Sequence, residues 1–591
     1  MSESPDSAFS EEKKAGSSQE QLTKPSVESV VGSDDGRANQ GLSQQSPVRV
    51  FSVRATLIAG LILVCVVLFS LYVRVADYGF YEDDYWGIVP WFKTSAAQMW
   101  NITISHLETW PTGRPLNHIL PKWFAWLGYH MAGVQGIYFL GFLVHSTNAF
   151  LLYLLLRRWL GQWAALLAGC LFVLLPIDTT RIFLLHSAHV HTSLTFLLVA
   201  LLVSRTRYWL ASFPIAGLSL LSYETAFLPF IVFPLFLLDR NKRISRGLIH
   251  LTGCGLVLLI VFAVRLHLGD ARASSVVSGP GEMIWRMISS LWIGPETDLR
   301  TLAIAAVQAP HASPPFAFLY AALVGFLLCI APRLIKEPPS ASAEGPNRQK
   351  MIAVFLGGFA AWIFAYALTL TNYPPTQETG RLTSTHTAAV FGLTCVISAA
   401  VAYFRSFTKP SLRGLVTVLM SVFLGWLTLY SFRIQSGYAY AWAQERLFWQ
   451  RVIHLCPDLT PRTRILLIGT EGAQSPFILT NSWADPLVLR DAFSGDQSPI
   501  LVYYNGLGRA TEIRYENGQV TWKPIFWGNE RETLDLNNLI LLRDDGTDLT
   551  RIDEFKISEV PFPLESKKPA VPTAQASPTS LTDFGRFLFK P

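Results

Sequence analysis

Three consecutive carboxylates stand in the stretch Phe80-Tyr81-Glu82-Asp83-Asp84-Tyr85-Trp86, which follows the first long apolar segment of the chain. A membrane span does not need such a triplet, and its aromatic neighbours suit the lipid–water boundary. A carboxylate held at that boundary is partly desolvated, so its pKa should rise and it should serve as a general base. The alternative is a solvated loop that only ends a helix. The many Trp, Tyr and His residues nearby favour a functional site.

The composition is that of a polytopic membrane protein. Half of the 591 residues are apolar and only 15% are charged, whereas soluble domains carry about 25% charged residues. The net charge of +6 lies mostly in short loops, as the orientation rule for membrane proteins expects, so we expect no nucleic-acid partner. The six cysteines show no CxxC and no paired spacing, which indicates neither a disulfide framework nor a zinc site.

Apolar runs of about 20 residues, long enough to cross a bilayer, recur along the chain. We count about eleven such runs. The count is approximate because the fifth and sixth runs are short and closely joined. We place them near residues 55–74, 135–156, 162–178, 183–203, 207–222, 224–239, 247–266, 314–333, 351–371, 384–404 and 414–432.

Basic residues orient these spans. Arg49 and Arg54 precede the first span, which predicts a cytoplasmic N-terminus. Each loop that then falls inside carries at least two Lys or Arg residues. An odd number of spans places the C-terminus outside. We therefore expect a multi-pass protein of the cell (inner) membrane, with a cytoplasmic N-terminus and an extracytoplasmic C-terminus.

Three regions are predicted. Residues 1–50 are rich in Ser, Glu, Gln, Gly and Lys and should form a disordered cytoplasmic tail. Residues 51–432 should form the multi-pass membrane domain. Its first outer loop, 75–134, contains an aromatic stretch at 119–127 that suits a helix lying in the interface, and residues 267–312 form a second outer loop rich in Gly, Pro and Ser.

Residues 433–591 should form a small extracytoplasmic α/β domain with a loose C-terminal tail at 561–580. We expect an amphipathic helix over 438–455 and strands over 464–469 and 500–504. A hairpin should span 513–522, because the Asn-Gly pair at 517–518 favours a tight turn. The fold class is therefore mainly α: a polytopic helical bundle with a small outer α/β domain.

The architecture resembles the GT-C superfamily of membrane glycosyltransferases, which includes the protein mannosyltransferases and the lipid A aminoarabinose transferases. The resemblance rests on Asp83-Asp84 early in the first outer loop, on the later Gly113-Arg114-Pro115-Leu116, on the many spans and on the soluble outer domain. It implies a polyprenyl-phosphate sugar donor and sugar transfer with a loop carboxylate as base. Many members have Asp-Glu where this chain has Asp-Asp, so the identity of the base stays open, with Glu82 as an alternative.

Sugar transfer with inversion needs one carboxylate near the acceptor hydroxyl and a positive charge near the departing phosphate. We predict Asp83 as the base, with Asp84 orienting it or binding the acceptor. Arg114 and Arg381 are candidates for the phosphate, because a guanidinium group matches phosphate geometry. Their alternative role is to anchor the chain at the interface. We expect no resident cofactor and no metal site, a divalent cation being the alternative source of positive charge.

Other polar residues are predicted to bind substrate. His186 and His189 are three residues apart and share one helix face, while His191 points elsewhere. The histidines could instead pack in the interior or bind a metal. His106 flanks the acidic loop and is a candidate for the acceptor. Glu224 lies in an apolar run, where it either faces the lipid-phosphate cavity or caps the sixth span.

We therefore interpret the chain as a membrane glycosyltransferase that moves a hexosyl or pentosyl group from a lipid-linked donor to a glycan, lipid or protein acceptor. The alternatives are a transporter or flippase of lipid-linked glycans and a non-catalytic membrane scaffold. A flippase would predict polar residues near midspan and repeated halves. The sequence shows few of the former and no internal repeat.

Overall fold

The computed structural model describes residues 52–238, 243–270, 280–311, 313–335, 348–367, 380–460, 462–469, 485–493, 500–505, 512–516, 519–523, 531–545, 548–555, 564–565 and 581–589. The predicted disordered tail, 1–50, lies outside these residues, as does most of the predicted loose segment at 561–580.

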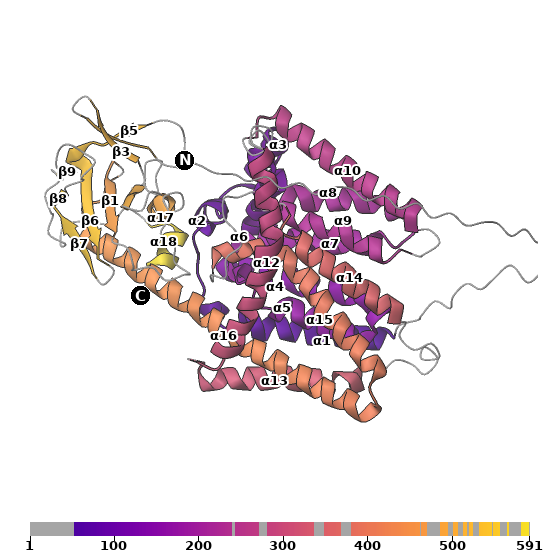
Figure 1. The fold of residues 1–591 in the computed structure, drawn as a ribbon. Coiled ribbons are helices and arrows are strands. Elements are labelled where there is room, and N and C mark those ends of the chain that lie inside the picture. The colour runs from indigo at the N-terminus through magenta and orange to yellow at the C-terminus, as the bar shows by residue number, and fades with distance from the viewer. Residues whose placement is uncertain are drawn as a thin grey trace, which may run out of the picture. The chain divides into compact units, whose positions relative to one another are not determined.

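Each apolar run predicted as a span coincides with a helix (Figure 1). The helices are α1 (Val53–Val67), α4 (Pro115–Leu160), α5 (Gln162–Leu174), α7 (Thr192–Val203), α8 (Ser212–Ser222), α9 (Leu228–Phe236), α10 (Arg243–His267), α13 (Pro315–Leu334), α14 (Arg348–Phe364), α15 (Thr387–Phe407) and α16 (Pro410–Leu455). The prediction of a mainly helical, multi-pass bundle is confirmed. Within the described residues, seven helical segments are long and apolar enough to cross a membrane, and three further apolar helices are shorter, so the count of eleven spans is not confirmed.

The core of the bundle surrounds α5. Every residue of this helix except Trp163 is buried, and the helix packs between α4 and α15. By contrast, α10 and α13 expose large apolar side chains such as Leu256, Leu259 and Phe326. A helix that is apolar and exposed faces lipid in a membrane protein, so α10 and α13 lie at the periphery of the bundle.

The segment between α1 and α4 contains several short helical turns. They are α2 (Asp84–Gly87), η3 (Val89–Trp91), α3 (Ala96–Thr109) and η4 (Pro111–Gly113). A capping box between Ser95 and Gln98 starts α3. The helix predicted over 119–127 is present as the first part of α4, which kinks where Gly133 adopts a φ of +61°. The kink separates this first part from the apolar remainder of α4.

One predicted loop is wrong. Within 267–312, residues Pro280–Gln308 form the long helix α12. Glycine, proline and serine residues lie both before this helix and within it, and Pro280 takes the first helical position, where its missing N–H costs nothing. Ile284, Ile288 and Trp292 recur at helical spacing and are exposed. The interspersed charges lowered the average hydropathy and hid this pattern.

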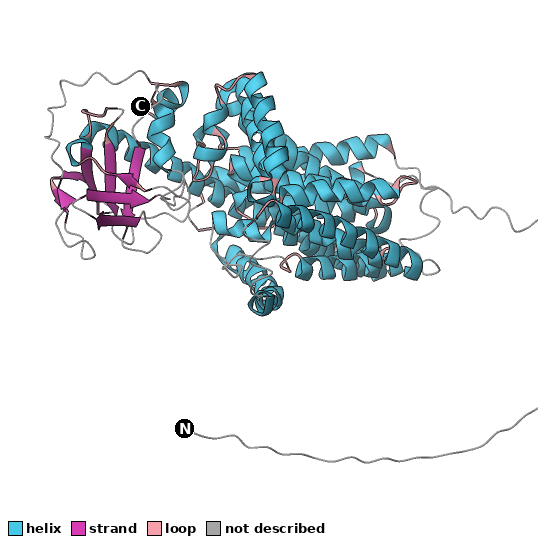
Figure 2. Ribbon diagram, turned by 90° about the horizontal axis from the view of Figure 1, so that it is seen from above, coloured by secondary structure: helices cyan, strands magenta, loops and turns pink. Residues whose placement is uncertain are grey.

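The C-terminal region contains a four-stranded sheet with the order β2-β1-β6-β7 (Figure 2). In it, β1 (Arg464–Gly469) runs parallel to β2 (Ile500–Asn505) and β6 (Leu539–Asp544), and β7 (Leu549–Ile552) is antiparallel to β6. The predicted hairpin is present, with β3 (Glu512–Glu516) paired to β4 (Gln519–Lys523) so that Ile513 faces Trp522. The remaining strands are β5 (Glu532–Thr533), β8 (Glu554–Phe555) and β9 (Leu564–Glu565).

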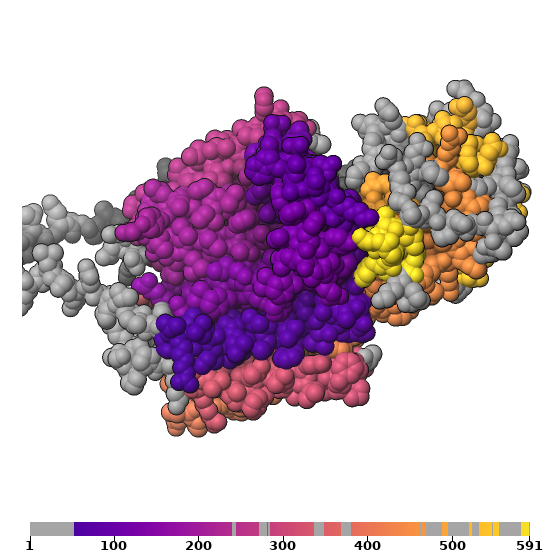
Figure 3. Space-filling view, turned by 180° about the vertical axis from the view of Figure 1, so that it is seen from behind, coloured from indigo at the N-terminus to yellow at the C-terminus, as the bar shows by residue number. Residues whose placement is uncertain are grey.

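Two further features of the C-terminal region differ from prediction or were not foreseen. The helix predicted over 438–455 is the continuation of α16, which runs unbroken from Pro410. The last described helix, α18 (Asp583–Leu588), packs Phe584 and Phe587 against Phe80, with ring centroids 5.6 and 5.7 Å away. Figure 3 shows the yellow C-terminal segment against the indigo to violet part of the chain. The acidic loop is therefore held from its Phe80 side.

Candidate functional site

Asp84 is completely buried and fixes the acidic loop. Its Oδ1 accepts a hydrogen bond from the backbone N–H of Leu185 at 2.8 Å, and its Oδ2 accepts one from that of Tyr81 at 3.1 Å. Burial raises the pKa of Asp84 to about 7, with these backbone N–H groups acting in the opposite direction. Both carboxyl oxygens face the protein's own backbone, so the geometry suits a role in holding the loop against the 184–186 turn.

Asp83 and Glu82 both face the guanidinium group of Arg381. The Arg381 Nη2 atom lies 3.1 Å from Asp83 Oδ2, and its Nε lies 3.9 Å from Glu82 Oε2. Asp83 Oδ1 also accepts a hydrogen bond from the indole N–H of Trp86 at 3.2 Å. Arg381 follows Glu82 and Asp83 by almost 300 positions in the sequence, yet the structure brings these three predicted site residues together.

The backbone of Glu82 has an uncommon conformation. Its φ is +43°, in the left-handed region that few residues other than glycine adopt. The side chain is only 2% exposed. Such a residue persists only where the surroundings fix it, and these positions cluster at functional sites. Here the conformation turns Glu82 and Asp83 toward the same arginine.

A second charged cluster surrounds Glu224, on the 3₁₀ turn η8 (Glu224–Phe227). Arg114 contacts both carboxylate oxygens: its Nε donates to Glu224 Oε1 and its Nη2 lies next to Oε2, both at 2.6 Å. Arg265 Nη2 lies 2.9 Å from Glu224 Oε1. A bidentate arginine–carboxylate pair is a strong, orientation-specific interaction. Glu224 therefore joins three separate segments. Its two predicted roles, at the lipid-phosphate cavity or as a cap of the sixth span, stay predictions.

Arg265 was not identified from the sequence. It lies near the end of α10, in a segment that was interpreted only as a span, although a charged residue there is a functional signal. Its Nε also donates to the carbonyl oxygen of Gly113 at 2.9 Å. Gly113 has a φ of +69°, and a Cβ at that position would lie 2.7 Å from Arg265 Nε. This explains the glycine that precedes Arg114.

Two buried histidines link the clusters. The rings of His186 and His189 lie 5.6 Å apart. The His186 ring lies 5.2 Å from Phe183, which stacks on Tyr81 of the acidic loop. The His189 ring lies 6.2 Å from Tyr223, and the Arg114 guanidinium group covers the Tyr223 ring at 5.3 Å. The Nδ1 atoms of both histidines are buried and have no hydrogen-bond partner among the described residues. His191 turns away, with its Nε2 3.5 Å from Asp178, as its position on the helix predicted.

His106 lies beside Lys122 and His118, and the His118 ring lies 5.9 Å from that of Trp86 in the acidic loop. The His106 Nε2 atom meets Lys122 Nζ at 2.6 Å, and the His106 ring lies 5.8 Å from that of His118. Burial, with the charge of Lys122 as a smaller cause, lowers the pKa of His106 to about 4. Its predicted acceptor contact remains a prediction. Within the described ranges, no three His, Cys, Asp or Glu side chains are grouped so as to hold a metal ion.

The lowered pKa of His106 predicts acid sensitivity. The unfolded chain takes up a proton near pH 6.5, but the folded chain does so only near pH 4, so stability should fall as the pH drops through this interval. In His106→Gln, melting temperatures measured between pH 4 and 7 should fall less steeply than in the parent. The exposed His130 supplies the matched control, His130→Gln, which should keep the parent slope. Equal slopes in all three proteins would contradict the assignment.

Comparisons with known proteins bear on this arrangement. Residues 114–267 match the family described as dolichyl-phosphate-mannose-protein mannosyltransferase, and this segment contains Arg114, both linking histidines, Glu224 and Arg265. No curated protein sequence matches the chain. A similar solved structure is that of ArnT from Cupriavidus metallidurans bound to undecaprenyl phosphate, with 15% identity, a TM-score of 0.37, and 76% of this chain and 86% of that chain covered. The family match supports the resemblance to GT-C membrane glycosyltransferases.

Proposed function

We propose that this chain is a membrane glycosyltransferase that moves a sugar from a polyprenyl-phosphate donor to an acceptor on the outer face of the membrane. The observation that carries the proposal is the meeting of Asp83 with Arg381, with adjacent rings that include His186 and His189 leading to the Arg114–Glu224–Arg265 cluster. Sugar transfer requires a carboxylate to take the proton of the acceptor hydroxyl and a positive charge to bind the departing phosphate, and Asp83 and Arg381 supply the two groups side by side. The family match over 114–267 supports the same reaction class.

Asp83 is the best candidate for the base. Both oxygens of Asp84 face backbone N–H groups, whereas Asp83 meets two side chains, Trp86 and Arg381. In the proposed step the acceptor oxygen bonds to the anomeric carbon while its proton passes to Asp83. The bond between the anomeric carbon and the phosphate oxygen breaks, and the phosphate leaves with the electron pair, which inverts the anomeric centre.

Arg381 is the best candidate for the phosphate. Its side chain is 35% exposed, and a guanidinium group binds phosphate through two parallel hydrogen bonds. Arg114 already uses two nitrogens on Glu224, so we assign it a supporting role in the second cluster. Binding of the donor phosphate to Arg381 would draw the guanidinium group away from Asp83 and leave that carboxylate available to the acceptor hydroxyl.

The two linking histidines suit the sugar. Each has a buried Nδ1 without a hydrogen-bond partner among the described residues, and such atoms are costly unless a ligand or water satisfies them. We expect His186→Ala and His189→Ala each to raise KM for the donor by about 3- to 10-fold, the worth of one neutral hydrogen bond. Steady-state kinetics with His130→Ala as the control test this. Unchanged KM values in both variants would remove the histidines from the donor site.

The function is tested by mass spectrometry of cell-surface glycans and glycolipids with and without the chain. A transferase predicts the loss of a sugar-bearing species when the chain is absent, and its return with the parent chain but not with Asp83→Asn. A flippase or a scaffold predicts that Asp83→Asn restores the species as well as the parent does. That result, with the variant inserted and folded, would overturn the proposal.

A further inference from the structure

Arg381 opens a short 3₁₀ turn, η11 (Arg381–His386), that immediately precedes α15. The turn packs against η5 (Thr180–Ile182) and carries the guanidinium group that meets Asp83. A long arginine side chain has much conformational freedom, so its placement depends on how firmly the turn is held. Two buried aspartates, neither used in the proposed chemistry, hold it from different sides.

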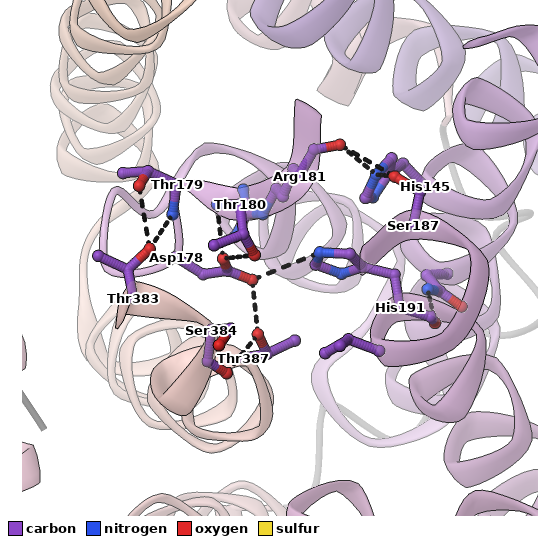
Figure 4. Close-up of polar contacts among 12 residues, drawn as sticks. His145, Asp178, Thr179, Thr180, Arg181, Ser187, His191, Thr383, Ser384 and Thr387 are labelled. Carbon is purple, nitrogen blue, oxygen red and sulfur yellow. Dashed lines mark hydrogen bonds and ion pairs between the residues drawn. The ribbon is translucent and has the colours of Figure 1, made fainter. Parts of the chain in front are cut away.

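Asp178 and its neighbour Thr179 hold the first side (Figure 4). Thr383 Oγ1 accepts a hydrogen bond from the backbone N–H of Thr179 at 2.9 Å, and the N–H of Gly380 donates to Thr179 Oγ1 at 2.8 Å. The hydroxyl of Thr387 donates to Asp178 Oδ2 at 2.8 Å. These bonds fix the turn at its start, near its middle and just past its end.

Asp298, on α12, holds the other side. Its carboxylate is completely buried and accepts hydrogen bonds from the indole N–H of Trp362 at 2.6 Å and from the hydroxyl of Tyr366 at 2.7 Å. His386, the last residue of η11, places Nδ1 2.8 Å from the second oxygen, Asp298 Oδ1. The Tyr366 hydroxyl donates its proton to Asp298 Oδ2 and also lies 2.6 Å from His386 Nδ1, so its oxygen accepts a hydrogen bond from Nδ1–H. Residues of α12, α14 and η11 thus meet at the Asp298 carboxylate.

We infer that Asp298 and His386 are positioning residues that hold η11, and through it Arg381, against the Glu82–Asp83 loop. The inference rests on the proposed function for its catalytic consequence, but not for its structural one. A buried carboxylate is costly unless donors surround it, and α12 supplies this one at the end of the turn that carries Arg381. His386 is the last residue of η11 and contacts Asp298, and Arg381 is the first residue of the same turn. We therefore expect the effect of Asp298 and His386 to reach the loop carboxylates through Arg381.

A double-mutant cycle tests the catalytic consequence. Asp298→Ala and His386→Ala should each lower kcat/KM at least about tenfold, whereas in an Arg381→Ala background Asp298→Ala should add less than about twofold, because the residues act through one group. His386→Asn, whose amide N–H can replace the Nδ1 proton, should recover most of the loss. Additive losses, or no rescue by Asn, would overturn the inference.

A control for damage to α12 is available nearby. The indole N–H of Trp426 donates to the carbonyl oxygen of Ala306 on α12 at 2.8 Å, away from η11. Trp426→Phe removes this bond and should leave kcat/KM within about twofold of the parent, since it does not reach Arg381. A loss equal to that of Asp298→Ala would show that any weakening of α12 has the same effect, and would overturn the inference.

Thiol labelling tests the structural consequence without any sugar donor. In an Arg381→Cys variant, a water-soluble maleimide reports access to the first residue of η11, and the parent protein, with its six native cysteines, gives the background. Adding Asp298→Ala should raise the labelling rate at least about threefold, because a loosened turn opens more often. An unchanged rate would overturn the inference. If the parent chain transfers no sugar, the proposed function fails and this measurement alone decides the inference.

Discussion

Replacing Asp83 by Asn should lower the rate of sugar transfer by between about 100-fold and 10,000-fold, the range that a general base contributes. Asparagine has nearly the same shape but cannot accept the hydroxyl proton. Its side-chain oxygen can still accept the hydrogen bond that Trp86 donates to Asp83 at 3.2 Å, so the loop should remain in place. Rates measured with purified protein in liposomes, together with the melting temperature, separate chemistry from folding.

Two matched variants make this result interpretable. Asp84→Asn disturbs a residue whose oxygens bind backbone N–H groups of Leu185 and Tyr81, so it should lower stability as well as rate. Glu82→Gln tests the neighbouring carboxylate, 3.9 Å from Arg381, which the sequence left open as the base. A loss of 100-fold or more in Glu82→Gln, with Asp83→Asn close to the parent rate, would transfer the role of base to Glu82.

Among the substitutions proposed here, Glu224→Ala should lower the free energy of unfolding most, by about 3–5 kcal/mol, the usual cost of breaking a buried ion pair. The change leaves Arg114 and Arg265 facing each other without the carboxylate that both contact, at 2.6 and 2.9 Å. Unfolding in mixed detergent micelles, followed by circular dichroism, measures the difference.

The control for this prediction is an ion pair on the surface. Arg74 and Asp77 lie 2.9 Å apart, with the Asp77 side chain about half exposed, and such pairs contribute little to stability. Asp77→Ala should therefore unfold almost like the parent. Should Glu224→Ala also unfold like the parent, the buried cluster would not be the joint between the three segments that the structure indicates.

Local patterns were sufficient to predict most of the fold. Apolar runs of spanning length predicted helices such as α1 and α13, because burial in a bilayer demands continuous hydrophobicity. The Asn-Gly pair predicted the hairpin in which Ile513 faces Trp522. The pattern failed for α12, where charged residues such as Asp298 interrupt the apolar face, and at the junction inside α16, where no local signal marks whether two helices are joined.

The site could be predicted only in part. Asp83, Arg114 and Arg381 were recognised as charged residues in unusual places, but which carboxylate each arginine meets depends on tertiary packing that the sequence does not reveal. Arg265 and His386 were missed for the same reason. Each lies in or beside an apolar helix, and its role depends on a contact with a residue of another segment, Glu224 for Arg265 and Asp298 for His386.

The most direct test of the account uses purified chain in liposomes that contain a polyprenyl-phosphate sugar and an extract of cell-envelope acceptors, with the lipids analysed by mass spectrometry. The account predicts that the parent chain converts the donor to free polyprenyl phosphate as a sugar-bearing acceptor appears, and that Asp83→Asn and Arg381→Ala convert the donor far more slowly. Equal conversion by the parent and by both variants would contradict the claim that Asp83 and Arg381 form the centre of sugar transfer.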